Sequence, residues 1–255
     1  MPQPWDPDRY LSYADERARP FVELLARIPV ADPATVVDLG CGPGNLTRLL
    51  ARRWPDAAVT GVDSSPAMIE RAGAEPSDVA WLLADVREWE GSADVVVSNA
   101  TLQWVPGHLD LLPRLAAGAR EVFAFQVPGN FTEPSHALRE ELAAEEPYRA
   151  HTHGLQRPSS HDPQTYLRVL EAEGFSVDAW ETTYLHVLPG EDAVFDWISG
   201  TSLLPTRAAL PEDLFERFAT ELRHRLRAAY PARNGQVVLP FRRVFAVARR
   251  TDGHR

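Results

Sequence analysis

The amino-acid sequence predicts an α/β fold with a doubly wound, mostly parallel sheet of seven strands. Short runs of apolar and β-branched residues alternate with helical patterns through the first half of the chain. A glycine-rich turn separates the first of these runs from the helix that follows it. The composition, 44% hydrophobic and 24% charged over 255 residues, is sufficient for a large buried core. The predicted strands are residues 35–39, 58–62, 79–83, 94–98, 121–127, 176–188 and 242–249.

The helices between these strands follow from start signals and apolar spacing. Residues 46–54 continue from the glycine turn, Ser65-Pro66 opens the next helix with proline in its first turn, and residues 108–117 form a third. We therefore expect residues 1–127 to form a cofactor-binding core with an N-terminal lid. The lid candidates are Trp5 and Tyr10, which could equally pack on the first helix.

Two stretches interrupt the alternation of strands and helices. Residues 128–162 contain several Pro and Gly residues around a single helical stretch, and residues 189–235 contain helical patterns at 191–198 and 211–229. Insertions at the carboxyl ends of strands lie over the ligand crevice of such folds. We therefore expect the second half, residues 128–255, to supply a helical cap from these insertions together with the last strands of the sheet.

Charge and residue usage exclude several classes of function. A net charge of −10 opposes the phosphate attraction on which nucleic-acid binding depends, so we expect no nucleic-acid partner. All 26 basic residues are arginine, which excludes a pyridoxal Schiff base and a Walker lysine. The one cysteine, Cys41, permits neither an internal disulfide nor a thiolate zinc cluster. With no membrane-length apolar run and no secretory leader, we expect a cytoplasmic protein without a membrane partner.

The most informative segment is the loop between the first strand and its helix, which reads Asp-Leu-Gly-Cys-Gly-Pro-Gly-Asn from Asp38. Closely spaced glycines let a ligand approach the backbone, and the helix start points N–H groups at it. Asp63, which ends the second strand, stands near the spacing of about 20 residues expected for a ribose contact. The loop therefore predicts a nucleotide-like ligand.

Departures from the dinucleotide pattern narrow the choice of nucleotide. A nicotinamide loop has its third glycine three positions after the second, where this chain has Asn45 and places Gly44 one residue earlier. Asp38, two residues before the first glycine, would repel a pyrophosphate. It can instead accept from a cationic amino group or tie down the loop. These features favour S-adenosylmethionine, which carries a sulfonium and an amino-acid end but no pyrophosphate.

At this point the chain resembles the class I S-adenosylmethionine-dependent methyltransferases, whose fold is Rossmann-like. The loop, the Gly61 to Ser65 segment, the Ala84 to Trp89 segment and the Ser98 to Trp104 segment match in order. The resemblance implies that Asp63 binds both ribose hydroxyls, that Asp85 and Val86 meet the adenine, and that the last segment borders the transferred methyl. A plain helix cap is the alternative for Asp85. The implied cofactor-binding residues are Asp38, Gly40, Gly42, Asn45, Asp63, Ser64, Asp85, Val86, Asn99 and Gln103.

A closer resemblance, to the trans-aconitate 2-methyltransferase family, extends over nearly the whole chain. The matching segments are Trp5 to Leu11, Arg17 to Phe21, Leu102 to Trp104, Pro128 to Phe131, Glu133 to His136, Trp180 to His186, Asp196 to Ile198 and Pro240 to Arg243. It implies methyl esterification of one carboxylate of trans-aconitate, with S-adenosylhomocysteine as the second product. A carboxylate with a pKa near ~4 is already a nucleophile at neutral pH. No general base is therefore needed, and we expect catalysis by positioning alone, with in-line transfer and no catalytic residue.

Neutral donors and arginine should surround a polycarboxylate substrate. Because side chains alternate along a strand, Tyr184 and His186 share one face of their strand. For the same reason Arg242 and Arg243 lie on opposite faces, and of these two we prefer Arg242 for the substrate pocket. The substrate candidates are Trp104, Gln126, Asn130, His136, Tyr184, His186, Trp197 and Arg242, each of which has a structural role as its alternative. We expect a monomer or a weak homo-oligomer.

We expect no metal site, because His151, His153, His161 and Asp162 lie in a Pro/Gly-rich stretch without helical spacing. Three other functions remain open at this stage. The chain could methylate another small acid or a natural-product hydroxyl, since cap residues alter the substrate without altering the loop. It could also bind the cofactor as a regulator without catalysis. A nicotinamide oxidoreductase is disfavoured by Asp38 and Gly44.

Overall fold

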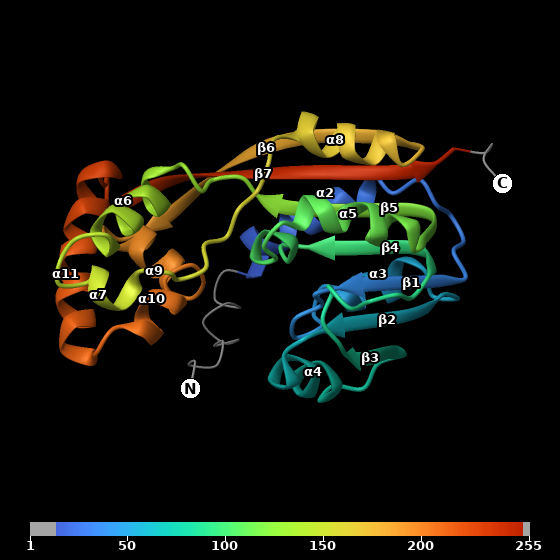
Figure 1. The fold of residues 1–255 in the computed structure, drawn as a ribbon, viewed down its shortest axis with the longest axis horizontal. Coiled ribbons are helices and arrows are strands. Elements are labelled where there is room, and N and C mark those ends of the chain that lie inside the picture. Colours follow the sequence, from blue (N-terminus) through green and yellow to red (C-terminus); the bar gives the residue numbers. More distant parts are fainter. Residues whose placement is uncertain (1–13, 252–255) are drawn as a thin grey trace. The chain divides into compact units, whose positions relative to one another are not determined.

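One seven-stranded sheet, in the order β3-β2-β1-β4-β5-β7-β6, organises the chain (Figure 1). The computed structural model describes residues 14–251. Strands β1 to β5 are paired in parallel, and β7 is antiparallel to β5. The strands are β1 (Thr35–Leu39), β2 (Ala58–Asp63), β3 (Val79–Leu83), β4 (Ala93–Asn99), β5 (Ala119–Pro128), β6 (Phe175–Pro189) and β7 (Gln236–Arg250). This mostly parallel seven-stranded sheet confirms the predicted fold class.

Helices connect the strands and cover both faces of the sheet, as a parallel sheet requires. The helices of the first half are α2 (Ala14–Ala26), α3 (Thr47–Arg53), α4 (Pro66–Gly73), the 3-10 helix η1 (Leu102–Trp104) and α5 (His108–Ala117). Those of the second half are α6 (Pro134–Ala143), α7 (Arg149–Thr152), α8 (Pro163–Ala172), α9 (Ala193–Ser199), α10 (Leu204–Ala209) and α11 (Glu212–Ala229).

The described chain divides into two compact units. The core unit comprises Asp15–Gly129, Pro158–Thr182 and the chain from Arg243 onward. The helical unit comprises Asn130–Arg157 and Thr183–Arg242 among the described residues. Strands β6 and β7 each contribute residues to both.

Alternating side chains of the central strands fill the core unit from both faces of the sheet. On one face, Phe123 and Phe125 of β5 are fully buried in a cluster with Leu112 of α5 and Tyr166 of α8. Phe125 meets the Tyr166 ring edge-on at 5.0 Å. On the other face, Phe245 of β7 stacks on Trp180 of β6 at 4.7 Å. The burial of strand residues on both faces explains their near-continuous apolar sequences.

The opposite ends of the central strands are held together by one carboxylate, that of Asp94. Its Oδ2 accepts the backbone N–H groups of Ala34 and Thr35 at 2.8 and 2.9 Å and the Thr35 hydroxyl at 3.2 Å. Its Oδ1 accepts from Arg120 Nε at 2.7 Å. The hydrogen bond from Arg120 is the main reason that the pKa of Asp94 lies below its ordinary value. Asp94 therefore joins the starts of β1, β4 and β5.

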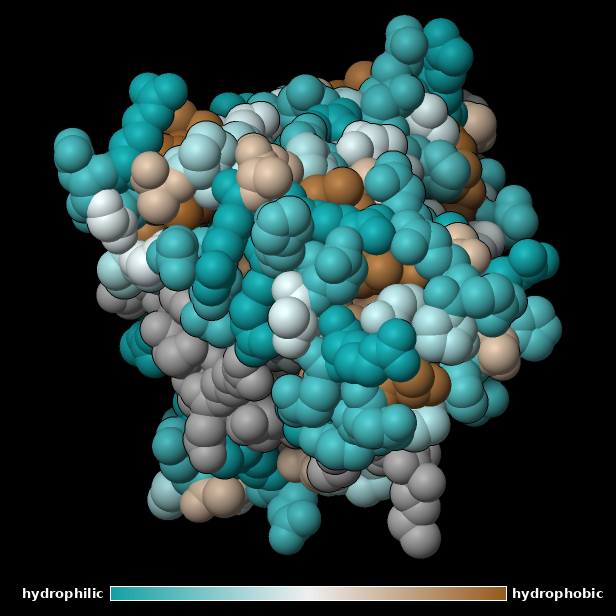
Figure 2. Space-filling model, turned by 90° about the vertical axis from the view of Figure 1, so that its left-hand side faces the viewer, coloured by the Kyte–Doolittle hydropathy of each residue, from teal (hydrophilic) through white to brown (hydrophobic). Residues whose placement is uncertain are grey.

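The helical unit has its own apolar core. Trp197 of α9, Phe218 of α11 and Tyr148 before α7 are buried in one cluster. The Tyr148 and Phe218 rings meet edge-on at 5.1 Å. Figure 2 looks onto the helices of this unit and shows a mainly hydrophilic surface with small, separate apolar patches. The amphipathic pattern of α11 thus follows the usual division between a buried stripe and a solvated face.

The structure corrects the start of the last strand. The sequence predicted that this strand covers residues 242–249. In the structure β7 begins at Gln236. Its register with β5 covers only Arg243 to Arg249, so Pro240 lies outside that ladder and costs it no hydrogen bond. Arg242 and Arg243 are consequently near the middle of the strand.

Three helices also depart from the sequence interpretation. The 128–162 stretch has two helices, α6 and α7, where we expected one, because Pro147 interrupts the helical pattern between them. Helix α10 was missed because six residues are too short for a periodicity to be recognised. Helix α8 was also missed, although Asp162-Pro163 is a start signal. Asp162 accepts the Thr165 N–H at 2.7 Å, which makes it the N-cap of α8.

Of the helices within residues 14–251, none combines the length and apolar character that crossing a bilayer requires.

The carboxylate of Asp94 leads to a prediction about stability. We expect Asp94→Asn to lower the free energy of unfolding at pH 7 by about 1–3 kcal/mol, because a charged acceptor is lost from four donors. The pKa of Asp94 is lowered by folding, so this stabilisation is complete above the unfolded-state pKa of about 3.9 and is lost as the pH falls through the folded-state pKa. Urea unfolding at pH 3 to 8 measures it.

The matched control for this experiment is Asp56→Asn, at an exposed position between α3 and β2. We expect that substitution to change the free energy of unfolding by less than about 0.5 kcal/mol. A difference between wild type and Asp94→Asn that stays constant down to pH 3 would contradict the electrostatic explanation.

Candidate functional site

The glycine loop, residues 40–45, joins the carboxyl end of β1 to α3 in the core unit. The N–H groups of Gly40 and Cys41 donate to the Val62 carbonyl of β2 at 2.7 and 3.0 Å. Gly44 N–H returns to the Cys41 carbonyl at 3.2 Å and closes the turn before the helix. The loop is thus fixed on the end of the neighbouring strand.

Packing explains why two of these positions are glycine. Gly40 has φ +81°, and a Cβ placed on it would lie 2.0 Å from Thr101 Oγ1. At Gly44 the added Cβ would lie 2.4 Å from the Trp81 ring. Gly42, with φ +55°, is different, because a Cβ there would meet nothing within 4 Å among the described residues. The loop is therefore packed at both ends and open in its middle.

Asp38, at the end of β1, is a buried carboxylate beneath this loop, 2% exposed. Its Oδ2 accepts the Thr47 hydroxyl of α3 at 2.6 Å. Burial is the main cause that raises its pKa to about 6, opposed by the Thr47 hydrogen bond and assisted by the negative charge of Asp63. Among the described residues, its Oδ1 has no hydrogen-bond partner. A buried carboxylate oxygen without a hydrogen-bond donor favours a ligand that carries a cationic group.

Asp63 ends β2 and holds the loop from the other side. Its Oδ2 accepts the Gly42 N–H and its Oδ1 accepts the Ser65 N–H, both at 2.9 Å. An ionised carboxylate has about four acceptor positions, so two bonds leave capacity for further donors. Ser64, next to it, is exposed. Ser65 caps α4 by accepting the Met68 N–H at 3.4 Å, as the Ser-Pro pair predicted.

After β3 the chain turns at Asp85, which is half-buried. Its carboxylate accepts the Arg87 N–H at 2.8 Å and forms an ion pair with the Arg87 guanidinium at 2.6 Å. The side-chain hydrogen bond from Arg87 is the main cause that lowers the pKa of Asp85. Val86 is buried. Arg87 is the partner that sequence spacing did not suggest, and an adenine amine would share the Asp85 carboxylate with it.

Side chains near the carboxyl ends of β4 and β5 and in the middle of β7 form a hydrogen-bonded chain in the core unit. Gln126 Nε2 donates to Asn99 Oδ1 at 2.8 Å, and Arg243 Nη1 donates to Gln126 Oε1 at 3.4 Å. Asn99 and Gln126 lie opposite each other in the strand register. Gln103 of η1 is buried and donates to the Ala100 carbonyl at 2.5 Å. The structure thus brings three predicted residues, Asn99, Gln103 and Gln126, to one edge of the sheet, where half-buried Trp104 also lies.

Of the two neighbouring arginines of β7, Arg243 is the buried one. Arg243 is 7% exposed, whereas Arg242 is only half-buried. Their opposite faces follow from strand alternation, as predicted. Arg243 is therefore the more buried of the pair, and the sequence preference for Arg242 stays a prediction.

In the helical unit, several predicted substrate residues form an aromatic group. His186 of β6 stacks on Trp197 of α9 with ring centroids 4.6 Å apart, and Tyr184 lies 6.3 Å from His186 on the same strand face. Phe241 of β7 lies 5.8 Å from both His186 and Trp197. Phe241 was missed as a site candidate because an apolar residue in a strand pattern is ordinarily core.

Asn130 and His136 of the same unit are buried polar side chains with unfilled hydrogen-bonding capacity. Among the described residues, neither side-chain atom of Asn130 has a partner, and His136 Nδ1 has none. Burial, assisted by the positive charge of Arg139, lowers the pKa of His136 to about 3. His136 is therefore neutral at pH 7. Buried polar groups of this kind are rare unless a ligand or water completes them.

The remaining candidate residues lie in turns, at the start of a helix or outside the described part of the chain. Asn45 is half-buried in the turn that begins α3. Trp5 and Tyr10 lie outside the described residues. His161 and Asp162 belong to the start of α8, where the Tyr166 hydroxyl accepts the His161 N–H at 3.0 Å. No group of three or more His, Cys, Asp or Glu residues within 14–251 is arranged to hold a metal ion.

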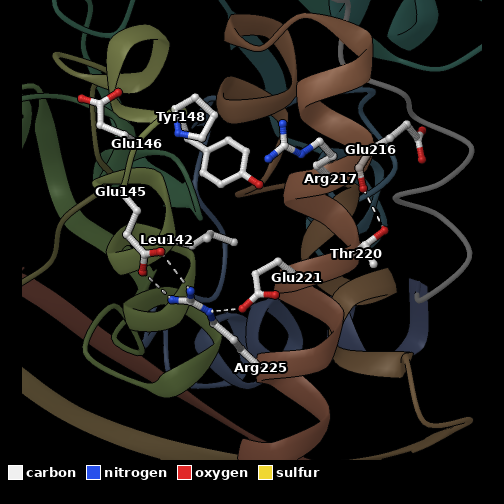
Figure 3. A pocket seen from close by; sticks show the side chains of 10 residues that line it. Leu142, Glu145, Glu146, Tyr148, Glu216, Arg217, Thr220, Glu221 and Arg225 are labelled. Carbon is white, nitrogen blue, oxygen red and sulfur yellow. Dashed lines mark hydrogen bonds and ion pairs between the residues drawn. The ribbon is translucent and has the colours of Figure 1, made fainter.

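A surface pocket of about 580 Å³ lies in the helical unit, between the α6–α7 segment and α11 (Figure 3). Arg225 of α11 bridges its wall, with ion pairs to Glu145 at 2.8 Å and to Glu221 at 2.9 Å. Four glutamates and two arginines line it, so its lining is acidic. None of the predicted site residues within 14–251 is among the lining residues.

Residues 10–179 match the family described as methyltransferase domain. A trans-aconitate 2-methyltransferase of Streptomyces avermitilis is 50% identical over 258 residues, which cover 96% of each chain. One from Streptomyces coelicolor is 52% identical over 270 residues, which cover 98% of this chain and 88% of the relative.

Among solved structures, the magnesium protoporphyrin IX methyltransferase of Synechocystis with bound SAH superposes with a TM-score of 0.52. The alignment covers 95% of this chain and 84% of that chain at 15% sequence identity. At this identity the likeness shows a shared fold.

The packing of the glycine loop gives a second prediction. We expect Gly40→Ala to lower the free energy of unfolding by about 2–5 kcal/mol, because the new Cβ overlaps Thr101 and the left-handed backbone disfavours any side chain. Gly42→Ala is the matched control, with the backbone cost of about 1–2 kcal/mol alone. Adding Thr101→Gly should restore part of the loss at Gly40. Equal losses at Gly40 and Gly42 in urea unfolding would contradict the packing argument.

Proposed function

Because the chain belongs to the family of trans-aconitate 2-methyltransferases, we propose that it transfers a methyl group from S-adenosylmethionine to a carboxylate of trans-aconitate. The products are the methyl ester and S-adenosylhomocysteine. One observation carries the proposal: about half of all residues are identical to two such enzymes over nearly the full length of the chain, including the segments outside the cofactor loop.

The residues around the glycine loop fit the cofactor. Asp38 presents a buried Oδ1 that lacks a partner among the described residues, which suits the ammonium of an amino acid. The space over Gly42 suits a ligand lying against the backbone. We propose that Asp63 and Ser64 hold the ribose, that Asp85 and Val86 hold the adenine, and that Asn45, Asn99 and Gln103 complete the site. When bound, the cofactor supplies an electrophilic methyl group on a sulfonium.

The work left to the protein is to orient the acid and offset its charge. The substrate carboxylate is already ionised near neutral pH, so no side chain has to remove a proton. Neutral donors and an arginine can hold the remaining carboxylates while excluding water. We propose this role for Trp104, Gln126, Asn130, His136, Tyr184, His186, Trp197 and Arg242. The neutral state of His136 suits a hydrogen-bond donor rather than a proton carrier.

We further propose that the enzyme acts in the cytoplasm, as a monomer or weak homo-oligomer, without nucleic-acid partners. Its single cysteine and net charge of −10 support this proposal. We also propose that residues 1–127 form a cofactor-binding core and that the inserted helices form a cap that shapes the acid pocket.

The first test is methyl transfer from radiolabelled S-adenosylmethionine to trans-aconitate, cis-aconitate, citrate and isocitrate in parallel. We expect a labelled product, formed preferentially from trans-aconitate, that is released by mild base because it is an ester. If calorimetry shows cofactor binding but no methyl is transferred to any of the four acids, the assignment of trans-aconitate as the substrate is contradicted. That result would leave a methyltransferase for another acceptor or a non-catalytic binding protein.

The pKa of Asp38 gives a test of its proposed contact. Between pH 7.5 and 7 we expect a nearly constant dissociation constant for the cofactor, because Asp38 is ionised there. Near pH 6 we expect an increase of about twofold, and below that an increase approaching tenfold per pH unit, because Asp38 becomes protonated while the cofactor ammonium stays charged. Asp38→Asn should weaken binding at pH 7.5 and remove this dependence. The same pH dependence in Asp38→Asn, measured by calorimetry, would exclude Asp38 as its origin.

A further inference from the structure

Arg114 lies in the last turn of α5, but its guanidinium is bound to a different segment of the core unit. A basic residue at this place ordinarily interacts with the last carbonyls of its own helix. Here Nη1 donates to the Trp89 carbonyl, and Nη2 donates to the Arg87 carbonyl and, at 3.4 Å, to the Val86 carbonyl. One guanidinium thus holds three backbone carbonyls of the turn that follows β3.

This turn, residues 85–89, resembles the end of a helix. The Glu88 N–H donates to the Asp85 carbonyl at 2.9 Å, and the Trp89 N–H donates to the Val86 carbonyl at 3.4 Å. Successive carbonyls of such a turn point in similar directions and need donors from elsewhere. A guanidinium presents five N–H donors in a rigid planar fork and can bind several of these carbonyls at once. The arginine therefore matches the turn in both charge and shape.

Packing holds the far end of the same turn. The Trp89 side chain is buried. A Cβ on Gly118 would lie 2.7 Å from its ring, and a Cβ on Gly91 would lie 2.9 Å from it. The two glycines thus leave the space that the indole fills. The turn is therefore fixed by packing at Trp89 and by Arg114 at the carbonyls nearer to Asp85.

Arg87 connects this arrangement to the carboxylate of Asp85. Its carbonyl accepts from Arg114, while its own N–H and guanidinium donate to the Asp85 carboxylate at 2.8 and 2.6 Å. The direction of the carboxylate therefore depends on how the backbone at Arg87 is held. A contact that has to discriminate between ligands needs groups that are fixed before the ligand arrives.

Resting on the function proposed above, we propose that Arg114 is a positioning residue for the adenine of the cofactor. By holding three carbonyls of the 85–89 turn, it fixes the Asp85 carboxylate and Val86 where the base meets them. It acts through the turn and contributes to selectivity for a base with an amine over one with an oxygen at the same position.

The test measures by calorimetry the dissociation constants of S-adenosylhomocysteine and of S-inosylhomocysteine, in which an oxygen replaces the adenine amine. For the wild type we expect S-inosylhomocysteine to bind at least about tenfold more weakly, because the oxygen cannot donate to a carboxylate. Arg114→Gln should weaken S-adenosylhomocysteine by about 5- to 30-fold and S-inosylhomocysteine by less than about threefold. The ratio of the two constants should therefore fall, which loss of fold stability alone does not predict.

Arg53→Gln is the matched control in the same unit. Arg53 of α3 also binds backbone carbonyls, those of Leu25 and Ile28 at 2.5 and 2.8 Å, but these lie at the end of α2. We expect urea unfolding to show a loss of stability in both variants, while Arg53→Gln keeps the wild-type ratio of dissociation constants. Arg114→Lys should give an intermediate ratio, because an ammonium keeps the charge but not the planar fork.

Several results would overturn the inference while the proposed function stands. These are equal weakening of both ligands in Arg114→Gln, an unchanged ratio in that variant, or the same fall of the ratio in Arg53→Gln. If Arg114→Gln does not fold, a wild-type ratio in Arg114→Lys decides against the inference. Equal binding of both ligands by the wild type would contradict the adenine contact of Asp85 and the role of Arg114 with it. Failure of the wild type to bind S-adenosylhomocysteine would instead contradict the proposed function itself.

Discussion

The carboxylate of Asp63 is the contact on which the candidate site depends. It accepts one N–H from the glycine loop and one from the turn before α4, and so joins two strand-to-helix connections at the same sheet edge. The loop is further held by the Val62 carbonyl, through the N–H groups of Gly40 and Cys41. Because these bonds fix the backbone, Asp38 beneath the loop keeps its position although burial of its charge is unfavourable.

Charge explains the rest of the arrangement. Burial, with a smaller contribution from the charge of Asp63, raises the pKa of Asp38. Burial, followed by the charges of Asp38 and Asp63, raises the pKa of the Cys41 thiol in the same loop. The cofactor side is therefore acidic and suits a cationic ligand. The buried guanidinium of Arg243 in β7 lies opposite Pro128, the last residue of β5.

The buried polar groups of the helical unit add a second requirement. Asn130 and His136 are buried with hydrogen-bonding atoms that no described residue satisfies, and Tyr184, His186 and Trp197 are packed as aromatic neighbours. Such groups cost stability when unsatisfied. A ligand that offers several oxygen acceptors to donors of this kind would offset the cost, which agrees with a polycarboxylate substrate.

The sequence by itself determined which strands and turns carry the residues of the candidate cofactor site. These features are local sequence patterns, in which turn geometry and short spacing decide the structure. They are the apolar strand before Gly40, the acidic residue Asp63 that ends β2, and the Ser65 cap of α4. Tertiary structure decided what distant residues do together. Pro240 lies inside β7, outside the residues of that strand that pair with β5, and Gln126 of β5 donates to Asn99 of β4. Arg243, rather than Arg242, is buried because the register with β5 selects the face, and alternation alone cannot tell which face of a strand is covered.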